Sequence, residues 1–182
     1  MRARSGAAPD GIVLAAGWST RMGHPKALTR LGGETAVERI VRACHEAGCG
    51  SVRVVAPPGV PLPPLDAHVL VNPDPDAGRT GSLQMALRGD ALVWPVDHPL
   101  AAPGTARALL ATPGEWVVPT WGGKGGHPVV LRGGAVALVR AARPDAPLRD
   151  ALRGARRVDV PVEDEGVLAN LDAPGDVARH AG

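Results

Sequence analysis

The 182-residue chain contains no phenylalanine and no tyrosine, and tryptophan alone supplies its aromatic content of 2%. Leucine, valine, alanine and isoleucine must therefore fill the core. So few aromatic rings leave little for nucleic-acid bases to stack on. The formal net charge of +2 is also too small to favour a polyanionic partner. We therefore expect neither nucleic acid nor an acidic membrane as a partner.

Long apolar runs are missing as well, because no stretch approaches the roughly 18 apolar residues of a membrane-spanning helix. Residues 1–10 lack the apolar segment of a signal peptide, and we expect them to form a flexible tail. The only cysteines, Cys44 and Cys49, have no nearby set of metal ligands. We expect reduced thiols in a cytoplasmic protein. The remaining residues, 11–182, favour a single domain.

Lysine is nearly absent too. Of the 20 lysine and arginine residues only Lys26 and Lys124 are lysines, and both lie in glycine-rich segments. An ammonium group acts on phosphates as a compact point charge, whereas a guanidinium group is planar and bidentate. Chance survival in an arginine-rich composition is the alternative explanation, but it does not account for the positions of the two lysines.

The most informative pattern lies in residues 11–28. The apolar run 12–14 is typical of a buried strand, and it leads into a glycine-rich loop. Glycines let the backbone turn sharply and present bare N–H groups to an anion, and the loop adds two cations. We interpret it as a binding site for phosphates, in particular a triphosphate; a tight turn without a ligand is the alternative. Its glycines and cations are Gly17, Gly23, Arg21 and Lys26.

Apolar runs alternate with helical spacings along the rest of the chain, which implies parallel strands joined by right-handed crossovers. We expect strands over residues 12–15, 51–56, 67–71, 91–96, 116–119, 158–162 and from 128 onward, and helices over 34–47, 79–87, 104–111, 135–142 and 148–152. Residues 57–66 contain five prolines and should form an irregular connector. The predicted fold is a three-layer α/β sandwich, Rossmann-like, with a mostly parallel sheet.

Two further segments of this pattern are candidates for ligand binding. Asp97 follows the strand 91–96 directly, and open α/β sheets bind ligands at the C-terminal ends of their strands. A carboxylate there suits Mg²⁺ on a triphosphate, although Asp97 could instead cap the helix 104–111. Ser82 is predicted to cap its own helix, which would turn a second set of N–H groups outward; an ordinary capped turn is the alternative.

The segment Leu14-Ala-Ala-Gly-Trp-Ser-Thr-Arg-Met-Gly-His-Pro-Lys26 resembles the signature loop of the MobA-like nucleotidyltransferases, which carry L-A-[AG]-G-x-S-x-R-M-G followed by a lysine. The likeness is greatest to the branch that makes molybdopterin dinucleotide cofactors. The resemblance implies that Arg21, Lys26 and Asp97 are catalytic, with the two cations on the β- and γ-phosphates. The nucleotide-binding residues that it implies are Leu14, Ala15, Ala16, Gly17, Ser19, Arg21, Lys26, Gly81 and Ser82.

The same resemblance extends to a metal site. The D-x-P step at Asp97 resembles the metal-binding aspartate of the family, and Asn170-Leu-Asp-Ala-Pro174 resembles its D-I-D-T-P stretch. Together they imply Mg²⁺ as a cofactor, held by Asp97 and Asp172. A simple helix-start signal is the alternative explanation of the second stretch.

An acceptor site is implied by Gly126-His127-Pro128, which resembles the G-H-P element of the molybdopterin cytidylyltransferases. The glycines around Lys124 predict a mobile loop, and His127 could be merely structural. Residues 143–149 depart from the family, because Pro144 and Pro147 stand where its members have glycine. The implied acceptor-binding residues are Lys124, Gly126, His127 and Arg149.

The implied reaction is transfer of a nucleoside monophosphate from an NTP to a phosphorylated acceptor, with release of pyrophosphate. CTP is favoured as donor and molybdopterin as acceptor, because guanylyl-transferring relatives more often carry glycine at the position of Ala16. The alternatives are a sugar- or alcohol-phosphate nucleotidyltransferase and a nucleotide-binding regulator without turnover. Retention of Asp97 and Lys26 argues against the regulator.

Overall fold

The computed structural model describes residues 8–16 and 24–171. Eight strands form the main sheet in the order β10-β7-β9-β6-β1-β4-β5, with β8 paired to β7. Their bounds are β1 Asp10–Leu14, β4 Val52–Ala56, β5 His68–Val71, β6 Ala91–Pro95, β7 Trp116–Trp121, β8 Lys124–Gly125, β9 Val129–Leu131 and β10 Arg157–Pro161. A separate short hairpin joins β2 (Arg30–Leu31) to β3 (Glu34–Thr35).

The sheet is parallel in two parts that an antiparallel strand joins. β6, β1, β4 and β5 pair in parallel, as do β7 and β10, while β9 runs antiparallel to both β6 and β7. Because β1, β4 and β6 are parallel neighbours, their C-terminal ends meet at one edge of the sheet, where Leu14 lies opposite Val55 and Pro95. The C-terminal ends of these strands therefore lie side by side, directly before the predicted phosphate loop and Asp97.

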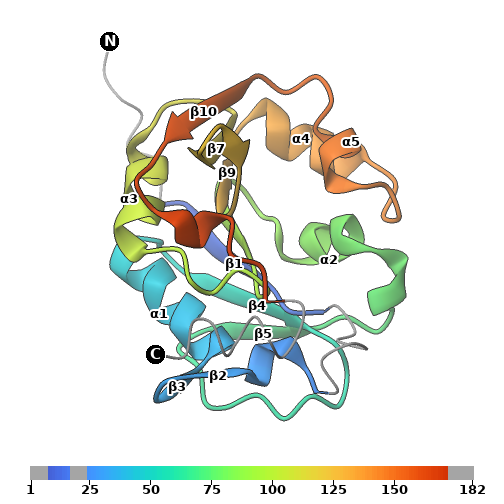
Figure 1. Ribbon diagram of the computed structural model, residues 1–182. Coiled ribbons are helices and arrows are strands. Elements are labelled where there is room, and N and C mark those ends of the chain that lie inside the picture. The colour runs from blue at the N-terminus through green and yellow to red at the C-terminus, as the bar shows by residue number, and fades with distance from the viewer. Residues whose placement is uncertain (1–7, 17–23, 172–182) are drawn as a thin grey trace.

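Helices cover both faces of this sheet (Figure 1). The helices α1 (Ala36–Ala47) and α3 (Pro103–Ala111) pack on one face, and α2 (Arg79–Ala86), α4 (Gly134–Ala141) and α5 (Leu148–Ala151) pack on the other. Buried side chains form two clusters, one on each side of the sheet. The three-layer α/β architecture is thus confirmed. The remaining helical turns are the 3₁₀ segments η1 (Lys26–Leu28), η2 (Pro75–Ala77) and η3 (Glu165–Val167).

The first helix begins later than its periodicity predicts. Thr35 caps α1, because its side chain accepts a hydrogen bond from the Glu38 N–H while the Glu38 carboxylate accepts one from the Thr35 N–H at 2.7 Å. Glu34 and Thr35 belong instead to β3. At the other end Gly48, with φ of 100°, terminates the helix in the left-handed conformation, as its sequence position predicts.

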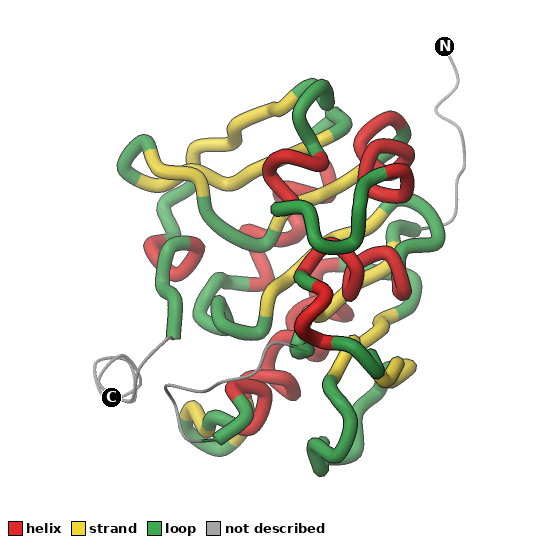
Figure 2. The backbone as a smooth tube through the Cα atoms, turned by 90° about the vertical axis from the view of Figure 1, so that its right-hand side faces the viewer, coloured by secondary structure: helices red, strands yellow, loops and turns green. Residues whose placement is uncertain are grey.

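Loops lie at the ends of nearly every strand, and Figure 2 shows them in green beside the yellow strands. The proline-rich residues 57–66 contain no helix or strand, as predicted. The segment around Lys124 differs from the prediction of a mobile loop, because β7 and β8 form a tight hairpin. Its turn residues Gly122 and Gly123 have φ of 57° and 77°, which only glycine adopts readily.

Within the described ranges, no helix combines the length and the apolar character needed to cross a membrane.

Candidate functional site

The end of β1 leads into the predicted phosphate loop. Ala15 continues the strand pairing, since its N–H donates to Val55 O at 2.8 Å, and the Val96 N–H donates to Leu14 O at 3.0 Å. Leu14, Ala15 and Ala16 are all buried. Lys26, which follows the loop in the sequence, is the first residue of η1. The predicted residues Gly17, Ser19 and Arg21 lie outside the described residues.

Asp97 lies at the same edge of the sheet, just after β6. Its side chain is 12% exposed, and its Oδ2 is 3.4 Å from Nη2 of Arg79. Its Oδ1 is buried and accepts no hydrogen bond from the described residues. The Asp97 carbonyl oxygen accepts the Leu171 N–H at 2.8 Å. Leu171 is the residue before Asp172, the predicted second metal ligand, which lies outside the described residues.

Asp97 does not cap the following helix. The N-cap residue of α3 is Ala102, and its N–H donates to Oδ2 of Asp164 at 2.8 Å. The same Asp164 oxygen accepts the Thr105 hydroxyl at 2.6 Å. Asp164 therefore accepts the hydrogen bonds at the start of α3 that a capping role would have given to Asp97. The Asp97 carboxylate is left available for a ligand.

A divalent cation fits the carboxylate of Asp97. A buried carboxylate oxygen without a hydrogen-bond partner destabilises the folded protein. Such an oxygen is normally bound by an ion or a water molecule. Hard cations such as Mg²⁺ take oxygen ligands and use one or two carboxylates together with substrate phosphates. The described residues contain no group of three or more His, Cys, Asp or Glu side chains that could hold a metal by themselves. Asp97 can thus supply one ligand to a site that other groups complete.

The first turn of α2 differs from the prediction. Gly78 is its N-cap residue, without a side-chain cap, and the helix begins at Arg79. Ser82 lies one turn inside the helix, where its hydroxyl donates to Gly78 O at 3.2 Å and accepts from Asn72 Nδ2 at 3.0 Å. The prediction that Ser82 caps this helix is wrong.

The N–H groups of this turn do not point outward unpaired either. Those of Gly81 and Ser82 donate to Pro144 O at 2.9 Å and to Gly78 O at 3.2 Å. The Thr80 hydroxyl donates to Ala146 O at 2.6 Å. The proline-containing segment 143–147, which departs from the family pattern, thus packs on α2. A role for Gly81 and Ser82 at the nucleotide base stays a prediction.

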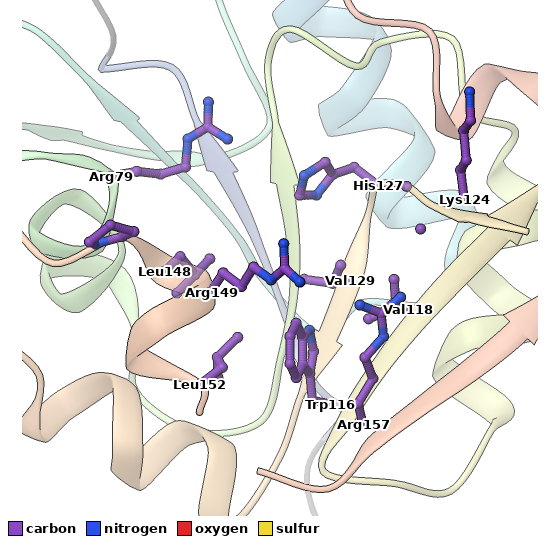
Figure 3. Close-up of a pocket in the computed structure, with 13 residues that line it drawn as sticks. Arg79, Trp116, Val118, Lys124, His127, Val129, Leu148, Arg149, Leu152 and Arg157 are labelled. Atoms are coloured by element: carbon purple, nitrogen blue, oxygen red, sulfur yellow. The ribbon is translucent and has the colours of Figure 1, made fainter. Parts of the chain in front are cut away.

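A cavity of about 720 Å³ lies between α5 and the strands β7 and β9 (Figure 3). It brings together all four predicted acceptor-binding residues, Lys124, Gly126, His127 and Arg149. Arg149 extends from α5 toward the middle of this pocket, while Lys124 lies at its far side, on β8. The structure therefore places the four residues in one site, as an acceptor-binding role requires.

The charged and aromatic residues of this pocket that were not predicted are Arg79, Trp116 and Arg157. The guanidinium of Arg157 lies over the Trp116 ring, 5.3 Å from its centroid. Trp116, Arg149 and Arg157 also line an adjoining cavity of about 530 Å³. Arginine that faces an aromatic ring in a pocket is suited to anionic ligands with a flat ring system.

His127 is neutral over the physiological pH range. Burial, together with the nearby His98 and Arg79, lowers the pKa of His127 to about 3. Its Nδ1 is buried and makes no hydrogen bond to the described residues, and its ring centroid lies 4.7 Å from that of His98. The His127 N–H donates to Val167 O at 2.9 Å, and the bond to Pro128 is cis.

This low pKa makes stability depend on pH. His127 takes up a proton in the unfolded chain below about pH 6.5 but stays neutral in the folded protein, so stability falls as the pH drops from 6.5 toward 3. His127→Gln should remove up to about 1.4 kcal/mol of this loss per pH unit. Urea unfolding of both proteins at pH 7, 6 and 5 measures the effect. Parallel pH profiles for the two proteins would contradict it.

The fold and the buried Asp97 carboxylate together define an α/β protein with a candidate ligand site at the C-terminal ends of its parallel strands. Residues 11–160 match the family described as the MobA-like NTP transferase domain. The chain belongs to this family, and the resemblance seen in the sequence is confirmed.

The chain is similar to a protein of Mycobacterium tuberculosis H37Rv named probable molybdenum cofactor guanylyltransferase, with 36% identity over 64% of this chain. The alignment spans 66% of that relative, just under two thirds of its length. The relatives that share the molybdenum cofactor name are called guanylyltransferases, so these names do not bear out the predicted preference for CTP.

Solved structures share the fold. A crystal structure of Rv0371c from Mycobacterium tuberculosis H37Rv has a TM-score of 0.79 and 21% identity, and covers 96% of this chain and 98% of that one. The molybdopterin-guanine dinucleotide biosynthesis protein A from Archaeoglobus fulgidus has a TM-score of 0.72 and 17% identity, with coverages of 94% and 96%. A further structure of Rv0371c is a complex with manganese.

Proposed function

We propose that this protein transfers a nucleoside monophosphate from an NTP to molybdopterin and releases pyrophosphate. The observation that carries the proposal is the buried Asp97 carboxylate, whose Oδ1 is unpartnered among the described residues, at the strand edge where β1 leads into the phosphate loop. Family membership and the name of the mycobacterial relative support it. The cationic pocket beside Asp97 supplies room for the acceptor.

The chemistry needs positioning and neutralisation of charge, with little covalent participation by the protein. An acceptor phosphate oxygen attacks the α-phosphorus, and pyrophosphate leaves. Arg21 and Lys26 would hold the outgoing phosphates. Asp97 and Asp172 would hold a divalent metal ion such as Mg²⁺, which supplies positive charge to the phosphates. Arg149 and Lys124 would neutralise the negative charge of the acceptor phosphate.

The donor base is proposed to be guanine. The sequence favoured CTP because guanylyl-transferring relatives more often carry glycine at the position of Ala16, where a methyl group could narrow the space beside the base. Ala16 is only 3% exposed, however, and belongs to the core cluster with Val55 and Leu83. A methyl group packed into the core does not form a wall of the base pocket. The named relatives point to GTP. CTP remains the alternative that Gly126-His127-Pro128 favours.

Pyrophosphate release from GTP, CTP, ATP and UTP, each with and without molybdopterin, tests this function. Release should require molybdopterin and a divalent metal, and kcat/KM should favour GTP over CTP by at least about tenfold, or 1.4 kcal/mol. The opposite preference would assign CTP as the donor. Release with sugar phosphates but not with molybdopterin would overturn the acceptor.

Lys26→Arg should weaken NTP binding by about tenfold, or 1.4 kcal/mol. The planar guanidinium is larger than an ammonium group and fits a glycine-rich phosphate loop poorly. Calorimetric titration with a non-hydrolysable NTP measures the change. Lys124→Arg makes the same substitution on the β7–β8 hairpin and should leave NTP affinity unchanged. Equal losses of NTP affinity in the two variants would show that Lys26 does not bind the phosphates.

A further inference from the structure

Arg79 stands between the carboxylate of Asp97 and the pocket that holds Arg149. Its Nη2 lies 3.4 Å from Asp97 Oδ2, and its side chain is 50% exposed. It also lines the cavity of about 720 Å³, at the side across from His127 (Figure 3). One side chain therefore touches both of the sites that the proposed function assigns to different ligands.

Local structure does not account for an arginine at this position. Arg79 is the first residue of α2, and the N-terminus of a helix favours an anion and disfavours a cation. The separation of 3.4 Å from Asp97 is long for a charge-assisted hydrogen bond, and a half-exposed pair contributes little to stability. A loosely held cation in an unfavourable place suggests a role in binding.

The Asp97 carboxylate can accept more hydrogen bonds or metal bonds than its contact with Arg79 uses. Among the described residues, Oδ1 is buried and makes no hydrogen bond, while Oδ2 lies 3.4 Å from Arg79 Nη2. A cation that takes Oδ1 comes within a few ångströms of the Arg79 guanidinium. The two positive charges repel each other in a partly buried site, where electrostatic interactions are stronger than in water.

We propose that Arg79 and a divalent cation compete for Asp97, and that the cation releases Arg79 into the pocket, where it binds the anionic group of the acceptor. The acceptor half of this inference rests on the proposed function. Arg79 would then be an acceptor-binding residue that makes acceptor binding depend on the metal. By linkage, the acceptor should tighten metal binding by the same factor.

The competition can be tested without turnover. Mn²⁺ is titrated in the absence of nucleotide, with free Mn²⁺ followed by electron paramagnetic resonance. Arg79→Gln should bind Mn²⁺ about three- to fivefold more tightly than the wild type, the range expected when a partly exposed ion pair no longer competes. Arg39→Gln is the matched control, since Arg39 makes a 3.5 Å pair with Glu34 and is 37% exposed. Equal Mn²⁺ affinities in the wild type and Arg79→Gln would overturn the inference.

The acceptor half is tested by steady-state kinetics of pyrophosphate release. Arg79→Gln should raise KM for molybdopterin at least tenfold with KM for the NTP unchanged, and Arg79→Lys should recover part of the loss. Tighter Mn²⁺ binding with an unchanged KM for molybdopterin would show that Arg79 is only a counter-ion of Asp97. That result would overturn the proposal that Arg79 binds the acceptor. Absence of release by the wild type would instead overturn the proposed function, while the Mn²⁺ titration would still decide the competition.

Discussion

Asp97→Asn should lower kcat/KM for pyrophosphate release by about a hundredfold or more, which is the loss typical of removing a principal electrostatic group. The amide keeps the shape of the carboxylate but not the charge that a divalent metal ion needs. The side chain is 12% exposed and, within the described part of the chain, its Oδ2 lies 3.4 Å from Arg79. The fold should therefore survive, and the free energy of unfolding should fall by no more than about 1 kcal/mol.

Two measurements separate a metal ligand from a structural residue. Mn²⁺ affinity should drop together with activity in Asp97→Asn, while urea unfolding stays near that of the wild type. Asp66→Asn is the matched control, because Asp66 has a 94% exposed side chain that lies 3.4 Å from His45. It should leave both Mn²⁺ affinity and turnover unchanged. Near-normal activity of Asp97→Asn at saturating metal would show that Asp97 is no metal ligand.

The position of Asp97 could be predicted because it depends on local pattern alone. A continuous apolar run, Ala91–Pro95, forms a buried strand whatever its neighbours are, and a carboxylate just beyond such a strand lies at the sheet edge. The prediction of a phosphate loop after β1 follows the same logic, but residues 17–23 of that loop lie outside the described residues. Gly48 and the proline-rich connector were likewise predictable, since their backbone preferences act within a few residues.

The pocket could be predicted only in part, because its walls come from segments far apart in the chain. Trp116 meets Arg157 because β7 and β10 pair in parallel with these two residues in register, some 40 residues apart. Nothing in either segment by itself specifies that register. Arg79 was missed for a related reason: its importance depends on the packing of α2 beside the end of β6.

The error at Ser82 has a different cause. Serine followed by a helical pattern is a good N-cap signal, but Gly78 begins the helix one turn earlier with φ of 110°. The Ser82 hydroxyl is then engaged by Asn72 from the neighbouring loop, and the Gly81 N–H is engaged by Pro144. Tertiary contacts thus engage the hydroxyl that the local pattern assigned to capping and an N–H that it expected to face outward.

Gly126→Ala should destabilise the protein by about 2–3 kcal/mol, in the range of forced overpacking against a rigid neighbour. A methyl group at Gly126 would lie 2.3 Å from the Val167 carbonyl oxygen and 2.7 Å from its carbon. These are backbone atoms, which cannot rotate away. The Gly126 N–H is also held by Pro119 O at 2.8 Å, and the next N–H is held by Val167 O at 2.9 Å.

The strain should also reach the acceptor pocket, because relief requires η3 or the Gly126–Pro128 step to move. KM for molybdopterin should rise along with the loss of stability, and thermal unfolding should show a Tm lower by roughly 5–10 °C. Gly33→Ala is the matched control, since a methyl group there meets nothing within 4 Å. It should change the free energy of unfolding by less than about 0.5 kcal/mol. If both variants had the same Tm as the wild type, the close approach of Gly126 to Val167 would not be a feature of the folded protein.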